Sequence, residues 1–203
     1  MTAGTSLPAR PALSARLPAL AVAVLALAVL GGCGTRPVTT FDLTSRTAAS
    51  TPAARAGEAL TIIEPVALQA FDGNTIVVRG AAGELTMLSN AQWADRLPRL
   101  VQTRIVRSFE DAGRLGRVAR PGDGLVTARQ LNTELRQFNI DSATGEAVVE
   151  ISARVVESLS GSVVRARVFT ARVPVSGGVN GASAAVALDA ALARVLGELV
   201  VWA

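Results

Sequence analysis

The sequence predicts an α+β domain, in which a mainly antiparallel sheet carries two helices packed on one of its faces. Three segments, 128–140, 147–157 and 163–173, alternate apolar and polar residues, as strands do when one face of their sheet is covered. Two other segments, 97–109 and 184–201, repeat apolar residues at helical spacing. The resulting order of strands, helix, strands and helix is typical of the α+β class.

Short apolar runs that end at turn residues predict the remaining strands: 60–66, 75–78, 84–88 and 117–120. In the first of these, Pro65 marks a sheet edge or a stop because proline cannot donate to a ladder. The second and third flank Gly80 and Gly83 and form a hairpin. Hairpin connectors at 141–145 and 158–161 join the three long strands.

Each predicted helix has recognisable end signals. Asp95 is the expected N-cap of the first helix, Pro98 fits its first turn, and Gly113 ends it. Just before this helix, Asn90 is expected to begin a separate helical turn and Trp93 to lie over the sheet edge. The final helix follows a flexible break at 177–181 and has one apolar stripe: Leu188, Leu192, Val195 and Leu199.

The residue types that are missing exclude several classes of chemistry. The 203 residues include no His and no Lys, and Cys33 is the only cysteine. Catalytic triads and Cys-His pairs need His, and zinc, haem and iron–sulfur sites lose their usual ligands. A Walker A loop and a Schiff base both need Lys. Paired carboxylates and a carboxylate calcium site remain possible in principle, but no carboxylate pair stands on a framework that would raise one pKa. We expect a protein that is not an enzyme and has no cofactor and no metal.

The high isoelectric point is a weak argument for nucleic-acid binding. From Cys33 onward the chain has 18 Arg against 16 Asp and Glu, so the net charge of that part is small. The charges are interspersed, without a basic run that would follow a phosphate backbone. We expect no nucleic-acid partner.

The first residues have the pattern of an export signal. Arg10 and Arg16 precede a 14-residue apolar stretch, 17–30, which is the length of a signal-peptide core and is too short for a membrane span. This stretch ends in a sequence that resembles a bacterial lipobox: Leu30, Gly31, Gly32 and Cys33. We expect cleavage before Cys33 and acylation of its thiol and amine; a plain signal peptide or an anchor helix is the alternative.

These features divide the chain into three parts. Residues 1–32 are the predicted lipoprotein signal peptide, 33–57 the acylated N-terminus with a flexible tether, and 58–203 the folded domain. Within the tether, the patch 40–43 has the character of an extended piece that packs on the domain. Gly34 follows the acylated position, and by resemblance to enterobacterial lipoproteins this favours the outer membrane over the inner membrane, facing the periplasm.

Few residues of the domain are candidates for a site. Asp72-Gly73-Asn74 has the start of a calcium loop but lacks the later ligands, so it is interpreted as a turn. The segment 88–100 is the most distinctive. Trp93 in it is interpreted as a packing residue, with contact to a partner protein as the alternative. Asn90 and Asp95 are the other candidates for that partner contact.

Several segments together resemble the ABC-type transport auxiliary lipoproteins, relatives of the paraquat-inducible protein C lipoprotein. The resemblance runs from about Phe41 to Trp202. Where members of that family have a Tyr-containing motif, this chain has Phe41-Asp42-Leu43, which keeps the ring but loses the hydroxyl. The segments that carry the resemblance are Gly83-Glu84-Leu85, 90–100 (NAQWADRLPRL), the 119–122 turn (ARPG), and Leu131, Glu134, Leu135 and Phe138.

The resemblance implies a non-catalytic accessory role beside a lipid-trafficking system. Its partners would be an MCE-domain protein and the permease and ATPase of an ABC transporter. Phospholipid would be the cargo, and acylated Cys33 would hold the protein in the membrane. The family also favours a closed homo-oligomer, in keeping with the apolar ends of several strands. Two alternatives stay open: a lipoprotein that regulates or docks on another periplasmic machine, such as a peptidoglycan synthase, and one that itself carries a lipid.

Overall fold

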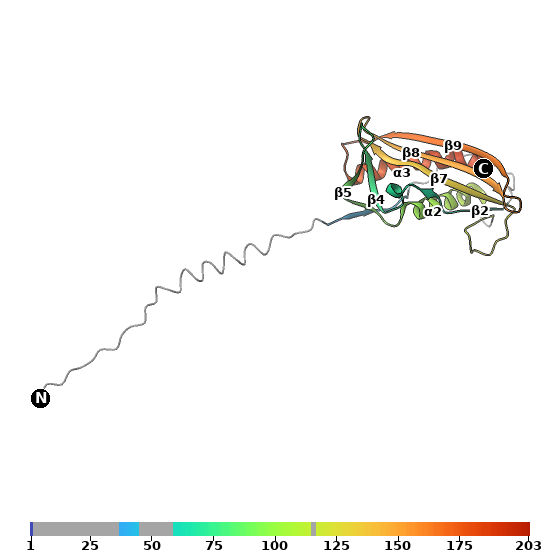
Figure 1. The fold of residues 1–203 in the computed structure, drawn as a ribbon, viewed down its shortest axis with the longest axis horizontal. Coiled ribbons are helices and arrows are strands. Elements are labelled where there is room, and N and C mark those ends of the chain that lie inside the picture. Colours follow the sequence, from blue (N-terminus) through green and yellow to red (C-terminus); the bar gives the residue numbers. More distant parts are fainter. Residues whose placement is uncertain (2–36, 45–58, 115–116) are drawn as a thin grey trace. The chain divides into compact units, whose positions relative to one another are not determined.

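The computed structural model describes residue 1 and residues 37–44, 59–114 and 117–203 of the chain. The predicted signal peptide, the lipobox, Cys33 and most of the tether lie outside these residues. The segment Val38–Ala203 forms one compact unit. It contains two α-helices, and Figure 1 shows them with a curved sheet. The α+β class is therefore confirmed.

The described strands form one sheet of nine strands. Strand β7 (Arg129–Asp141) lies at its centre and pairs with β8 (Glu146–Glu157), which pairs with β9 (Val163–Pro174). The other edge of β7 is shared by three short strands: β2 (Leu60–Ile62), β3 (Val66–Ala67) and β4 (Thr75–Arg79). The sheet extends from β4 to β5 (Leu85–Trp93) and β1 (Thr39–Phe41), and from β2 to β6 (Val118–Ala119).

The sheet is mixed, so the prediction of a mainly antiparallel sheet is wrong. The pairs β7–β8, β8–β9 and β4–β5 are antiparallel, as the hairpin connectors require. All three short strands run parallel to β7, and the pairs β1–β5 and β2–β6 are parallel as well. Alternation of apolar residues reports which face of a strand is covered, but it carries no information on the direction of its neighbour. Long connections, such as the one through the first helix, permit the parallel pairs.

Strand β5 is longer than predicted and contains Asn90. Between Met87 and Gln92 it has more residues than its partner β4 has between Val77 and Thr75, so β5 bulges there. Asn90 lies in this bulge with φ of 58°, a left-handed conformation that Asn adopts more readily than most residues. The prediction of a helical turn at Asn90 is therefore wrong.

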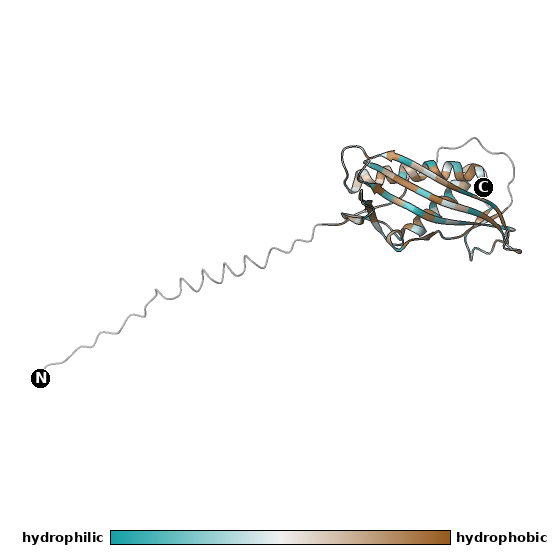
Figure 2. Ribbon diagram, turned by 45° about the horizontal axis from the view of Figure 1, so that its top comes forward, coloured by the Kyte–Doolittle hydropathy of each residue, from teal (hydrophilic) through white to brown (hydrophobic). Residues whose placement is uncertain are grey.

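Both helices lie on the same side of the sheet, behind the strands in Figures 1 and 2. Helix α3 (Gly181–Trp202) packs on β8 and β9, and α2 (Leu97–Phe109) packs on β2, β6 and α3. One continuous core lies between them. It includes the whole stripe predicted for the final helix: Leu188, Leu192, Val195 and Leu199.

The helix ends differ in detail from the predictions. Helix α3 begins three residues early because Asn180 and Ser183 form a reciprocal capping box at its start. Helix α2 has Arg96 at the N-cap position, without a side-chain cap. Asp95 precedes it, so its assignment as the N-cap is wrong by one residue. After α2 the chain makes a wider turn in which Gly113 has φ of 85°, as a glycine ending a helix does.

A buried ion pair joins the two helices to the N-terminal strand. Arg104 of α2 and Asp189 of α3 are both about nine-tenths buried or more, and Nη2 of Arg104 lies 4.0 Å from Oδ1 of Asp189. The other carboxylate oxygen of Asp189 accepts a hydrogen bond of 2.8 Å from the backbone N–H of Thr44. Leu43 beside it is 1% exposed. The segment after β1 is thus fastened to the helix layer by Leu43 and Asp189.

None of the helices in the described part of the chain is both long and apolar enough to cross a membrane.

Replacing Trp93 tests the core. Trp93 is 1% exposed and packs edge-on against Phe138, with ring centroids 5.8 Å apart. We expect Trp93→Ala to lower the free energy of unfolding by roughly 3–5 kcal/mol, the usual cost of removing a large buried ring. Trp93→Phe should cost clearly less, since the indole Nε1 has no hydrogen-bond partner to lose. Denaturant unfolding measures both, with the exposed Val186→Ala as control; an Ala variant as stable as the control would contradict the packing.

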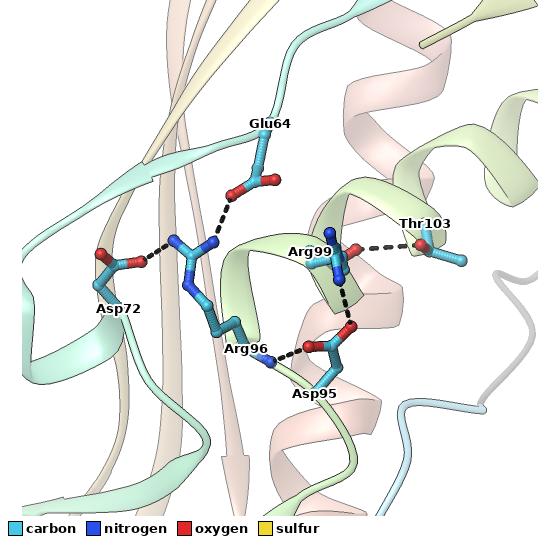
Figure 3. Close-up of polar contacts among 6 residues, drawn as sticks. All are labelled: Glu64, Asp72, Asp95, Arg96, Arg99 and Thr103. Carbon is cyan, nitrogen blue, oxygen red and sulfur yellow. Dashed lines mark hydrogen bonds and ion pairs between the residues drawn. The ribbon is translucent and has the colours of Figure 1, made fainter. Parts of the chain in front are cut away.

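Asp95 provides a pH test of the junction before α2. Its Oδ1 accepts the Arg96 backbone N–H at 2.7 Å and its Oδ2 accepts from Arg99 Nη1 at 3.4 Å (Figure 3). The backbone hydrogen bond from Arg96, followed by the contact with Arg99, lowers the pKa of Asp95 below its ordinary 3.8. A carboxylate whose pKa is lower in the folded protein than in the unfolded chain stabilises the fold at every pH above the unfolded pKa. That contribution is lost as the pH falls through the folded pKa.

We therefore expect Asp95→Asn to be slightly less stable than the wild type at pH 7. The difference should close as the pH falls below 3.8, when the wild-type carboxylate takes up its proton. Thermal unfolding over a pH series measures it. A stability difference that persists unchanged at pH 2 would show that Asp95 acts through packing and not through its charge.

Candidate functional site at the start of helix α2

The distinctive block 90–100 forms a tightly bonded corner of the fold. It contains the end of β5, a short connection and the first turn of α2. Backbone hydrogen bonds tie it to the preceding turn, from Trp93 N to Asn74 O at 2.7 Å and from Leu97 N to Gly73 O at 2.8 Å. The Asp72-Gly73-Asn74 segment thus serves as a turn, as interpreted from the sequence, and it positions the block.

The structure separates the three residues that were candidates for partner contact. Trp93 is in register with Phe41, so β1 covers this end of β5 and the ring lies in the core instead of over a sheet edge. Asn90 is exposed in the bulge of β5, and the side chain of Asp95 is 42% exposed before α2. The packing interpretation describes the position of Trp93. Contact with a partner stays a prediction, and only Asn90 and Asp95 present an accessible side chain for it.

Arg96 organises the polar contacts around the corner and was not identified from the sequence. One guanidinium nitrogen donates to Glu64 Oε1 at 3.1 Å, and the other makes a short hydrogen bond with Asp72 (Figure 3). These carboxylates come from the connection between β2 and β3 and from the loop before β4. The hydrogen bond with Asp72, and then its charge, raise the pKa of Arg96. No local pattern reveals this contact, since Glu64 lies 32 residues away in the sequence.

A hollow of about 360 Å³ adjoins this corner on the face of the sheet away from the helices. Glu64 belongs both to the arginine cluster and to the wall of the hollow. The floor comes from β7 and β8, where Asn132, Glu134, Ser152 and Arg154 alternate with residues of the core. The lining residues are Ile63, Glu64, Val66, Asn132, Thr133, Glu134, Ser152 and Arg154.

The polar groups of this region are arginines and carboxylates that are joined to one another by ion pairs and hydrogen bonds. Within residues 37–44, 59–114 and 117–203, no cluster of three or more Asp, Glu, Cys or His side chains is placed to hold a metal ion. The carboxylates at the corner are paired with arginine, as in a structural or docking surface.

Comparison with known proteins agrees with this description. The uncharacterized protein bll6063 of Bradyrhizobium diazoefficiens is 32% identical over 174 residues, which are 85% of this chain; the match spans only 46% of that relative. Protein XCC0632 of Xanthomonas campestris, a DUF330 crystal structure, is 32% identical with a TM-score of 0.74, covering 81% of this chain and 93% of that one. Another uncharacterized protein shares the fold, with a TM-score of 0.65 at 13% identity and coverage of 82% and 99%.

A family model matches residues 41–200, which include every strand from β2 onward and nearly all of α3. The family is described as a lipoprotein component that is auxiliary to ABC-type transport, which indicates a role other than catalysis and an association with the cell envelope. The model match and the structural similarity to XCC0632 agree on one assignment. This chain belongs to the family of ABC-type transport auxiliary lipoprotein components.

Proposed function

We propose that this protein is a lipid-anchored accessory subunit of an MCE-type ABC phospholipid transporter. The family match over residues 41–200 is the observation that carries the proposal. In this role the acylated Cys33 holds the protein on the periplasmic side of the envelope, with the outer membrane favoured over the inner. The domain binds the MCE protein, and through it the permease and ATPase, and takes no part in catalysis.

The packing of the domain argues against the alternative of a lipid carried inside the protein. Side chains of one continuous core occupy the space between the sheet and the two helices, including the rings of Phe71, Phe109, Phe138 and Phe169. Two acyl chains would have to displace many of them. An adaptor that works through its outer surface fits the structure better than a carrier with an internal pocket.

The exposed surface supports assembly with other proteins. Several large apolar side chains are exposed on the strands, among them Met87 on β5 at 68% and Val163 on β9 at 56%. Their exposure on one small domain motivates the proposal that copies of this chain form a closed homo-oligomer when they meet the MCE protein.

Substituting Cys33 tests the anchor. We expect Cys33→Ser to remain an unacylated precursor in the inner membrane, because the serine hydroxyl is not a substrate for lipid transfer. Metabolic labelling with a radioactive fatty acid should mark the wild type only. The matched control is the Cys33→Ser variant with Ser142→Cys added. It should stay unlabelled, because lipid transfer requires a thiol in the lipobox and not merely a thiol elsewhere in the chain. Equal label in Cys33→Ser would remove the lipoprotein assignment.

Purification from native membranes tests the partner. We expect the tagged full-length protein to co-purify with an MCE protein after mild cross-linking, and Asp95→Arg to reduce the yield of that complex severalfold if the α2 corner contacts it. Glu157→Arg, another charge reversal at an exposed carboxylate, is the control. Recovery of a peptidoglycan synthase in place of an MCE protein would support the alternative of a docking module for another machine.

A further inference from the structure

The hollow on the open face of the sheet lies where the ladder beside β7 is interrupted. Ile62 is in register with Leu131 and Val66 with Glu134, so three residues of one strand stand opposite two of the other. Pro65 lies in this interval and has no N–H to donate to a ladder. The chain therefore bends away from β7, and the gap is lined by polar side chains of β7 and β8.

Arg154 is the cation of the hollow and has no anionic partner among the described residues. No carboxylate of the described residues lies within ion-pair distance of its guanidinium, whereas Arg96, Arg136 and Arg172 each have two. Asn132, directly opposite in the register of β7 and β8, supplies an amide beside it. Ser152, which is 7% exposed, supplies a hydroxyl. This end of the hollow is suited to a monoanionic oxygen group, which a guanidinium binds with two hydrogen bonds.

The negative charges of the two carboxylates of the hollow, Glu64 and Glu134, are only partly neutralised by arginine. Glu64 shares Arg96 with Asp72, and their oxygens lie on opposite sides of one guanidinium (Figure 3). Glu134 shares Arg136 with Glu150 in the same way, at 3.5 and 4.0 Å. Each cluster therefore has two negative charges and one positive charge. This end of the hollow favours a ligand cation and disfavours a ligand that is purely anionic.

The two charged ends are separated by the width of a small zwitterion. Glu134 is in register with Ser152, so it is the diagonal neighbour of Arg154 across the ladder. Diagonal neighbours have their Cβ atoms about 7–8 Å apart. The two side chains form no ion pair with each other, which leaves both facing the hollow.

One exposed valine, Val66, lines the hollow, and a second, Val168, lies beyond the lining residues on β9. Val66 is in register with Glu134, and Val168 is in register with Ser152, so a row of four residues crosses the open face. Val66 is 69% exposed and Val168 is 43% exposed. Exposed valines that flank a polar centre offer contact to the apolar part of an amphiphile.

From these observations we propose that the hollow binds a zwitterionic phosphate headgroup. The monoanionic phosphate binds Arg154, Asn132 and Ser152, and the ammonium binds between Glu64 and Glu134. Val66 at the edge of the hollow, and Val168 beyond it, contact the glycerol and the first carbons of the chains. Only the choice of a lipid as the source of this headgroup rests on the proposed transport function; free glycerophosphoethanolamine has the same monoanionic phosphodiester and the same ammonium.

Calorimetric titration of the full-length protein in a maltoside detergent tests the site. We expect glycerophosphoethanolamine to bind more tightly than glycerophosphoglycerol, which has the same monoanionic phosphodiester but no ammonium. It should also bind more tightly than ethanolamine, which lacks the phosphate. Arg154→Gln and Glu134→Gln should each weaken binding about tenfold or more, the effect of losing one charge-assisted hydrogen bond. Arg165→Gln is the matched control, since Arg165 lies on β9 and donates to Trp202 O at 2.8 Å, outside the hollow.

The results distinguish the site from its alternatives. Equal affinity for glycerophosphoglycerol would overturn the zwitterion and leave a simple anion site. Unchanged binding by Arg154→Gln would place any binding elsewhere. Native mass spectrometry with phosphatidylethanolamine and free glycerophosphoethanolamine in competition decides between a lipid and a free headgroup as the source. These measurements use the isolated protein. Headgroup binding can therefore be found when co-purification with an MCE protein fails, and co-purification can succeed when no headgroup binds.

Discussion

The pairing of β7 along both of its edges is the constraint on which the rest of the structure depends. A buried strand must satisfy its backbone donors and acceptors on each side. One long strand, β8, does this along one edge of β7, whereas three short parallel strands divide the other. Since β4 leads into β5 and β1, and β2 leads to β6, every other strand is attached to β7 directly or through one of these neighbours. The hollow in the sheet is a consequence of the same division, because it lies at the gap between β2 and β3.

Much of this fold can be predicted from local patterns of the sequence. Alternation gave the bounds of the three long strands to within two residues, and the stripe from Leu188 to Leu199 identified the final helix and its buried face. Glycine at position 113 marked the turn that follows α2. Each of these signals arises from neighbours on the same element, so no knowledge of the tertiary structure was required.

Features that depend on distant segments were not predictable in this way. The extension of β5 to Trp93 requires β1, which lies about fifty residues earlier in the chain. The role of Arg96 depends on Glu64 and Asp72, which approach it only once the sheet is formed. The parallel direction of the short strands follows from connections that cross the domain, and a period of two residues is the same for both directions. The block around Trp93 was recognisable by its residues, yet its structural task, a corner bonded to Gly73 and Asn74, became visible only in three dimensions.

The bond between Thr44 and Asp189 has a mechanical consequence. The chain before Val38 enters the domain through β1, so any pull on that part of the chain reaches the domain there first. The load is resisted by a three-residue ladder to β5, by the buried side chain of Leu43 and by the hydrogen bond to Asp189, whose carboxylate is held in place by Arg104. Force applied at the N-terminal side of β1 is therefore passed into α2 and α3 together.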